Sequence, residues 1–344
     1  MDSTAPVPRD CGQAATRRLS FEFSGDSREY FRIWILNLFL SLLTLGIYSA
    51  WAKVRSERYF YGHTRLDGSS FEYTASPISI LKGRLVALAV VLLYSFVSSQ
   101  FPLTAPLFAV AFMFAMPWLV VRSLRFRHDN SRYRGIRFGF DGRYPRALIW
   151  YLLAPIGSVL TVFLAYPYVA CRQQQWLVRN SRFGDARFDT DLGTSSVYGV
   201  YIVGGGIALL GIVLQGLAAN FIPAGAGQLL LPLLSVPFYY LAFVFVDTQM
   251  TNLTLNHASL DEHRFESRME TAAVCRLLIT NTLGIMLSLG LLIPWAKIRM
   301  ARYRAECTGV LFRGEPDRYI QTREAEQNAF GEELGEALDI EVGL

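Results

Sequence analysis

The feature that most constrains this chain is a nine-residue block that occurs twice, each time after a long apolar run. Residues 51–59 read WAKVRSERY and residues 295–303 read WAKIRMARY. At the same spacing, Arg32 and Asn37 before the first block match Arg276 and Asn281 before the second. The pattern predicts a repeated unit in which an apolar segment leads directly into an aromatic and basic one.

The composition indicates that the apolar runs lie in a membrane. Of the 344 residues, 52% are hydrophobic and 18% are charged, and the mean hydropathy is +0.28. Soluble domains carry about 25% charged residues, so this chain is typical of a multi-pass membrane protein. Its basic residues gather at the ends of apolar runs rather than on a soluble basic face, which excludes a nucleic-acid-binding module. Residues 1–28 contain no apolar signal-peptide core, and we expect insertion to depend on internal segments.

Three further stretches resemble the first block and the residues that follow it. Residues 51–71, 118–138, 168–188 and 245–265 align over their full length, and we call these stretches and the second block, 295–303, the five junctions. Asp67-Gly68 lies between alternating residues and predicts a hairpin turn. The expected fold is therefore an all-α multi-pass membrane protein. It is built from tandem repeats of a transmembrane helix and a basic–aromatic interfacial helix, with short β-hairpins at the junctions.

The apolar runs predict seven crossings within a membrane domain of residues 21–313, at about 20 residues each. The expected crossings are 29–49, 79–99, 103–121, 147–170, 198–219, 228–246 and 272–293. Residues 1–20 read as a disordered tail and residues 314–344 as an acidic tail, either solvated or in contact with the basic junctions.

Seven crossings would place the first, second and fifth junctions on one face and the other two on the opposite face. The first set is richer in Lys and Arg, so the positive-inside rule places it and the C-terminus in the cytoplasm, with the N-terminus outside. The alternative is that the short segments 29–49, 147–170 and 272–293 enter the bilayer and return, which keeps all five hairpins on one face. Pro155 and Gly157 favour this alternative, and both arrangements leave the C-terminus in the cytoplasm.

Three sequence blocks carry a resemblance to a known family. They are FEFSGDSREYF at 21–31, TLGIYSAWAKVR at 44–55 and the C-terminal GEELGEALDIEVGL at 331–344. With these blocks the chain resembles the YjgN family, a bacterial inner-membrane family whose domain has no known function. The resemblance implies a multi-pass protein of the bacterial inner membrane and supplies no activity and no catalytic residues. The third and fourth junctions depart most from the family motif.

Signatures of hydrolytic, metal and cofactor chemistry are missing from the sequence. It contains no H-E-x-x-H, no G-x-S-x-G and no P-loop. The four cysteines form no C-x-x-C pair. We therefore expect no catalytic residue, metal or cofactor, and no enzyme activity. The scattered residues are Cys11, Cys171, Cys275, Cys307, His63, His128, His257 and His263.

Polar residues within the apolar runs are the first set of candidate site residues. Asn37 and Asn281 are deep in their runs, where they either hydrogen-bond between helices, at about 0.6–2 kcal/mol each, or line a polar path. Hydrogen bonding is the favoured interpretation. Arg32 and Arg276 lie nearer the segment ends, where they can extend to the interface.

The basic and aromatic residues of the junctions are the second set. They either fix topology and anchor the helices or bind anionic lipid headgroups, at about 1 kcal/mol per cation. The candidates are Trp51, Lys53, Arg55, Arg58, Arg122, Arg125, Trp295, Lys297, Arg299 and Arg302.

Repeated membrane units often enclose a binding site between them. The leading hypothesis is thus a transporter or channel-like protein for a small, anionic solute. The alternative is a non-catalytic membrane or envelope organiser that binds anionic lipid through its junctions. The expected partners are anionic membrane lipids and a small solute, and not nucleic acid.

Overall fold

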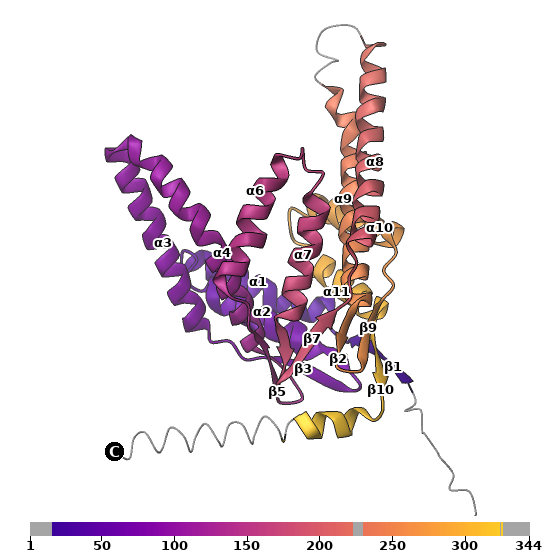
Figure 1. Ribbon diagram of the computed structural model, residues 1–344. Coiled ribbons are helices and arrows are strands. Elements are labelled where there is room, and N and C mark those ends of the chain that lie inside the picture. Colours follow the sequence, from indigo (N-terminus) through magenta and orange to yellow (C-terminus); the bar gives the residue numbers. More distant parts are fainter. Residues whose placement is uncertain (1–15, 223–229, 324, 326–344) are drawn as a thin grey trace, which may run out of the picture.

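The computed structural model describes residues 16–222, 230–323 and 325 of the chain (Figure 1). Its strands are β1 (Thr16–Phe23), β2 (Thr64–Leu66), β3 (Ser69–Tyr73), β4 (Ser131–Tyr133), β5 (Ile136–Phe140), β6 (Ser181–Phe183), β7 (Ala186–Thr190), β8 (Ala258–Leu260), β9 (His263–Ser267) and β10 (Thr308–Arg313). These strands form one closed antiparallel barrel, in the order β1-β10-β9-β8-β7-β6-β5-β4-β3-β2.

Helices connect the strands, and their bounds follow in chain order. They are α1 (Ser27–Leu43), α2 (Ser49–His63), α3 (Pro77–Gln100), the short η1 (Pro102–Thr104), α4 (Ala105–Asp129), α5 (Tyr144–Leu148), η2 (Ile149–Leu153), α6 (Ala154–Val159), α7 (Tyr166–Arg179), α8 (Thr194–Ala219), α9 (Pro232–Asn256), α10 (Thr271–Leu287) and α11 (Ile293–Cys307). Residues 316–323 are also helical.

Tight two-residue turns build the barrel from hairpins. In the β2–β3 turn, Asp67 and Gly68 have φ of 49° and 75°, and in the β4–β5 turn, Arg134 and Gly135 have φ of 47° and 80°. Positive φ at both central residues matches the twist of the flanking strands. The pairs β6–β7 and β8–β9 follow, and β10 pairs with β1, where Thr16 faces Arg313. The first and last strands are therefore neighbours, and their pairing closes the barrel.

The helices from α1 to α11 all leave the barrel at the same end. In each strand pair a helix leads into the first strand and another helix follows the second strand, as α2, β2, β3 and α3 do. The hairpin turns consequently lie at the opposite end. Figure 1 shows the helices extending from one end, here called the helix end, and the turns at the other, here called the turn end.

Four helical segments of the described chain are long and apolar enough to cross a membrane. They are Pro77–Gln100, Pro102–Asp129, Thr194–Ala219 and Pro232–Asn256, that is α3, η1 with α4, α8 and α9. They form two pairs that diverge in Figure 1. The α8–α9 pair packs closely because Gly204 and Gly211 face Val246 and Phe238, where an added Cβ would lie 2.4 Å and 2.6 Å from those side chains.

The three short apolar segments form helix–turn–helix pairs: α1 with α2, the α5–η2–α6 segment with α7, and α10 with α11. Leu45 and Leu289, in the turns of the first and third pairs, are each 94% exposed, as suits tips that enter lipid. Each pair returns to the helix end. One closed sheet contains the four sequential hairpins and the β10–β1 pair, and the number of membrane crossings stays a prediction.

The expectation of an all-α fold is wrong. The junction strands pair with one another around a full circle, which satisfies every sheet edge and makes the barrel the centre of the molecule. The strand β1 begins at Thr16, inside the expected N-terminal tail, and the helical residues 316–323 lie inside the expected acidic tail. The rest of both tails, 1–15, 324 and 326–344, and the start of the expected 228–246 segment lie outside the described residues.

Candidate functional site

A belt of apolar side chains crosses the barrel interior. It consists of five cross-strand pairs, one on each of β1–β2, β3–β4, β5–β6, β7–β8 and β9–β10. Each of five phenylalanines lies directly opposite an apolar residue of the next strand and has at least one charged sequence neighbour, as alternation across a barrel wall favours. The five pairs are Phe21 with Leu66, Phe71 with Tyr133, Phe138 with Phe183, Phe188 with Leu260 and Phe265 with Val310. We call Phe71, Phe138, Phe188 and Phe265 the phenylalanine ring.

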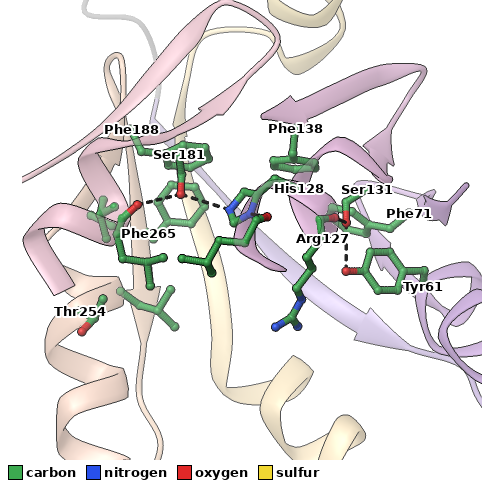
Figure 2. A pocket seen from close by; sticks show the side chains of 15 residues that line it. Tyr61, Phe71, Arg127, His128, Ser131, Phe138, Ser181, Phe188, Thr254 and Phe265 are labelled. Carbon is green, nitrogen blue, oxygen red and sulfur yellow. Dashed lines mark hydrogen bonds between the residues drawn. The ribbon is translucent and has the colours of Figure 1, made fainter. Parts of the chain in front are cut away.

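On the helix side of this ring lies a chamber of about 440 Å³. The phenylalanine ring bounds the chamber on the barrel side, and the last turns of α2, α4, α7 and α9 form its walls (Figure 2). The remaining lining residues are Tyr61, Leu124, Arg127, His128, Ser131, Leu177, Val178, Ser181, Thr254, Leu255 and Ala258. Most of this surface is apolar, in the size range of small-molecule sites.

A small polar group interrupts the apolar wall. His128 Nδ1 is 2.8 Å from the Leu124 carbonyl oxygen, and His128 Nε2 is 3.2 Å from Ser181 Oγ. Because a carbonyl only accepts, a neutral His128 donates from Nδ1 and accepts at Nε2. Ser131 Oγ donates to the Arg127 carbonyl oxygen at 2.8 Å and is 3.1 Å from the Tyr61 hydroxyl. The chamber thus joins a large apolar surface to a few fixed polar groups.

A second cavity, of about 250 Å³, lies on the turn side and shares all four members of the phenylalanine ring. Pro316, Tyr319 and Ile320 of the helical residues 316–323 also line it. His263 is 5% exposed and stacks on Phe312, with ring centroids 3.6 Å apart. Its Nδ1 accepts from the Arg313 backbone N–H at 3.2 Å, while its buried Nε2 has no partner. Burial lowers the pKa of His263, which keeps this ring neutral at pH 7.

Ion pairs hold the helical residues 316–323 across the turn end. Arg134 pairs with Asp317 at 2.6 Å and with Asp67 at 3.1 Å. Arg323 pairs with Asp261 at 2.7 Å and with Asp185 at 3.0 Å. The Tyr319 hydroxyl donates to Asp261 at 2.7 Å, and burial raises the pKa of this phenol. Residues 316–323 thereby close the barrel at the turn end with contacts to three hairpin-turn residues, Arg134, Asp185 and Asp261.

Three of the candidate lipid-binding arginines donate hydrogen bonds to backbone carbonyl oxygens. Arg58 donates to the Ala75 carbonyl oxygen at 3.4 Å, Arg125 to that of Gly142 at 3.3 Å, and Arg302 to that of Gly25 at 3.2 Å. Each bond ties a helix to the loop that follows the strand pair. Gln175 and Asn252 make the same contact in the remaining two pairs. These side chains stabilise the hairpins at the helix end.

The asparagine candidates lie inside the helix–turn–helix pairs, away from the chamber. Asn281 is 6% exposed and accepts from Arg299 Nη1 at 3.3 Å, whereas Asn37 is 4% exposed and has no hydrogen-bond partner. Lys53 and Lys297 line one small cavity together with Asn37. Trp51 and Trp295 are half-buried, and Arg299 lies over the Trp295 ring at 5.1 Å. The exposed candidates Arg32, Arg55, Arg122 and Arg276 join no cluster among the described residues.

Sequence reasoning missed the phenylalanine ring and the polar group of the chamber. The ring was visible as a signal, because a phenylalanine ends each of the junctions 51–71, 118–138, 168–188 and 245–265. Its inward direction follows only once the hairpins close on one another. Within the described part of the chain, no three His, Cys, Asp or Glu side chains converge as metal ligands.

Comparison with known proteins identifies the family. The model of a bacterial family of unknown function, DUF898, matches residues 18–337. The chain is a member of the DUF898 family. No solved structure matches it significantly.

Among curated proteins, this DUF898 member is similar to the inner membrane protein YjgN of Salmonella typhimurium, with 28% identity over 205 residues, 58% of this chain and 49% of the relative. It is also similar to YjgN of Escherichia coli O157:H7, with 27% identity over 128 residues, 36% of this chain and 31% of the relative. The matches span about half or less of these relatives. Together with four apolar helices, they support an integral inner-membrane protein of the YjgN type.

Proposed function

We propose that this DUF898 protein is a non-catalytic inner-membrane protein that binds the apolar part of an amphipathic molecule, a membrane lipid, in the chamber at the helix end. The observation that carries the proposal is the chamber itself, with phenylalanine and leucine walls and one small polar group. The acyl chain of a lipid fits such an apolar surface, which shields it from water. The polar group of the chamber can orient the lipid headgroup.

The position of the chamber supports a ligand from the bilayer. Two of the four wall helices, α4 and α9, are long and apolar enough to cross a membrane, and the chamber lies at their barrel ends. A lipid can therefore move along an apolar surface to the chamber mouth. A freely diffusing anion would meet the same phenylalanine and leucine surface, where Arg127 is the one arginine or lysine of the lining and too few donors remain to replace the anion's water.

Filling the chamber tests this proposal. Leu177→Trp and Thr254→Phe each add volume from a different wall, whereas Leu217→Trp, on an α8 surface that faces outward, is the matched control. The measurement is the lipid that co-purifies with each variant in mild detergent, read by native mass spectrometry. We expect roughly a tenfold loss of bound lipid in the filling variants only. Unchanged lipid in filling variants that melt like the wild type would contradict lipid binding in this chamber.

A second candidate is passage of a small solute along the barrel. The second cavity on the far side of the phenylalanine ring favours it, because the two cavities share one boundary. Hydrophobic constrictions of this kind stop ions by excluding water. In this hypothesis the ring is a gate, and residues 316–323 close the exit.

Widening the ring tests passage. Phe138→Ala with Phe188→Ala, in a chain that ends at Glu315, opens both closures at once. Flux of chloride and of glycerol into proteoliposomes should then exceed that of the wild type. If neither solute enters faster than into protein-free vesicles, the passage hypothesis fails while lipid binding stands.

We also propose that the barrel and both described chain ends face the cytoplasm. Lys53, Arg55, Arg122 and Lys297 are exposed on the segments that lead from the apolar runs into the barrel, as the positive-inside rule requires of a cytoplasmic face. A reporter enzyme that is active only in the cytoplasm, fused at the C-terminus, should be active. An active periplasmic reporter at the same place would reverse the orientation.

A further inference from the structure

A second site lies outside the chamber, between the two helix–turn–helix pairs that carry the repeated block. A cavity of about 330 Å³ is lined by α1 and α2 and by Lys297 of α11. Its polar lining includes Tyr30, Asn37, Ser49 and Lys53. The site therefore combines side chains from the two ends of the chain.

Two polar side chains of α1 are buried at this cavity without a partner. Asn37 is 4% exposed, and neither its Oδ1 nor its Nδ2 has a hydrogen-bond partner. The hydroxyl of the fully buried Tyr30 has none either. A buried polar group left unpaired lowers stability, and more so where lipid replaces water. Because residues 30 and 37 lie two helical turns apart on one face, their unused groups point to a shared ligand.

Positive charge surrounds these groups. Lys53 and Lys297 line the cavity from different helices, and Arg84 of α3 donates to Ser49 Oγ. Within the described residues, none of these three cations is within 4 Å of a carboxylate oxygen. Glu57 is the carboxylate of the lining. The balance of charge favours an anion that accepts several hydrogen bonds, and a phosphate group has that chemistry.

We propose that this cavity binds a phosphate group, with Lys53 and Lys297 neutralising its charge and Asn37 Nδ2 and the Tyr30 hydroxyl donating to its oxygens. Leu38 also lines the cavity and is half-exposed on the apolar outer surface of α1. A phospholipid can therefore place its headgroup in the site and its chains along α1. Free phosphate shares the same headgroup chemistry. The site is independent of the chamber.

Binding to the full-length, delipidated protein in detergent tests the proposal. One arm titrates phosphatidylglycerol and phosphatidylcholine by native mass spectrometry, and the other titrates inorganic phosphate by calorimetry. Lys53→Gln combined with Lys297→Gln should weaken phosphatidylglycerol binding at least tenfold, and Asn37→Leu should weaken it severalfold. Arg55→Gln, an exposed position on the same helix α2, is the matched control and should bind like the wild type.

The two arms separate the two sources of phosphate. Loss of both ligands in the double variant supports a site for the group itself, and loss of the phospholipid alone supports a site that also requires the attached chains. Phosphatidylglycerol and phosphate binding that is equal in the double variant, Arg55→Gln and the wild type would overturn the proposal. Because Lys53 and Lys297 are exposed, their variants are expected to fold, so this outcome remains decisive if Asn37→Leu fails to fold.

Discussion

The α1–α2 and α10–α11 pairs contain the same block and use it differently. In the C-terminal pair, Arg299 Nη1 donates to Thr280 Oγ1 at 2.6 Å and to Asn281 Oδ1 at 3.3 Å. Asn281 Nδ2 donates in turn to the Ala296 carbonyl oxygen at 3.4 Å. This pair satisfies its buried amide with its own side chains.

In the N-terminal pair the matching amide is left open. Leu36 occupies the position of Thr280, and Arg55, the match of Arg299, forms no hydrogen bond or ion pair with any described residue. Asn37 consequently has no partner. The two pairs differ at one neighbouring hydroxyl, and we infer that this hydroxyl holds the arginine against the amide in the C-terminal pair.

The largest expected difference between the pairs comes from removing the two amides. Asn281→Leu should lower the free energy of unfolding by about 2 kcal/mol, because it removes an acceptor from the buried side of Arg299. Asn37→Leu should leave the stability of the ligand-free protein unchanged or raise it, since it removes an unpaired group. Urea unfolding of both variants in the same micelles measures this, and equal losses would show that the two amides are equivalent.

The turns of the two pairs should respond alike. Gly46 and Gly290 have φ of 88° and 93°, while the nearest atom to an added Cβ is 3.7 Å away at Gly290 and none is within 4 Å at Gly46. Replacement by alanine should therefore cost about 1 kcal/mol at either position, through backbone strain rather than crowding. Thermal unfolding of each variant is the measurement. A loss confined to one turn would mean that the pairs differ at their tips as well.

Exchanging the hydroxyl tests the cause of the difference. Thr280→Leu should cost about 1 kcal/mol by removing the 2.6 Å bond to Arg299. Leu36→Thr should let Arg55 reach Asn37 and so lower phosphate affinity at the cavity beside Lys53. Unfolding measures the first effect and phosphatidylglycerol titration the second. Unchanged affinity in Leu36→Thr would separate the phosphate site from the amide.

Much of the membrane character could be predicted from the sequence, because long apolar runs and interfacial cations are local signals. The hairpins were also local, as at Asp67-Gly68. Closure of the barrel depends on a distant pairing, because β1 at 16–23 pairs with β10 at 308–313. The first strand of each sequential hairpin also has only three residues. Three residues are too few for alternation to show which side faces inward.

The same limit applies to the sites. The phenylalanine ring depends on which strands become neighbours. Its four residues could therefore be aligned in the sequence, but their orientation into the barrel could not be predicted. Asn37 and Asn281 looked identical because their difference depends on how far an arginine on the next helix reaches. Arg58, Arg125 and Arg302 looked like lipid ligands because basic residues near apolar ends usually are interfacial. Their backbone acceptors, such as the carbonyl of Gly25 for Arg302, lie far away in the sequence.

The smallest expected difference concerns the first turns of α1 and α10 and depends on pH. The N-cap residues Asp26 and Glu270 match, and each donates its backbone N–H to a tyrosine hydroxyl at 2.9 Å, that of Tyr59 or Tyr303. Only Asp26 also caps with its side chain, accepting from the N–H groups of Glu29 and Arg28. These two bonds hold the pKa of Asp26 below its ordinary value of 3.8.

Because the pKa of Asp26 is lowered in the folded protein, its carboxylate stabilises α1 fully when the pH is above the ordinary pKa. This contribution is lost as the pH falls through the lowered pKa. Amide exchange at Arg28 and Glu29, corrected for the intrinsic rate, should therefore accelerate below about pH 4, while the first turn of α10 changes less. Asp26→Asn should keep the cap and remove the pH dependence. Glu270→Asp should give α10 the acid sensitivity of α1. If both first turns of the wild type open together on acidification, the side-chain cap is not what distinguishes them.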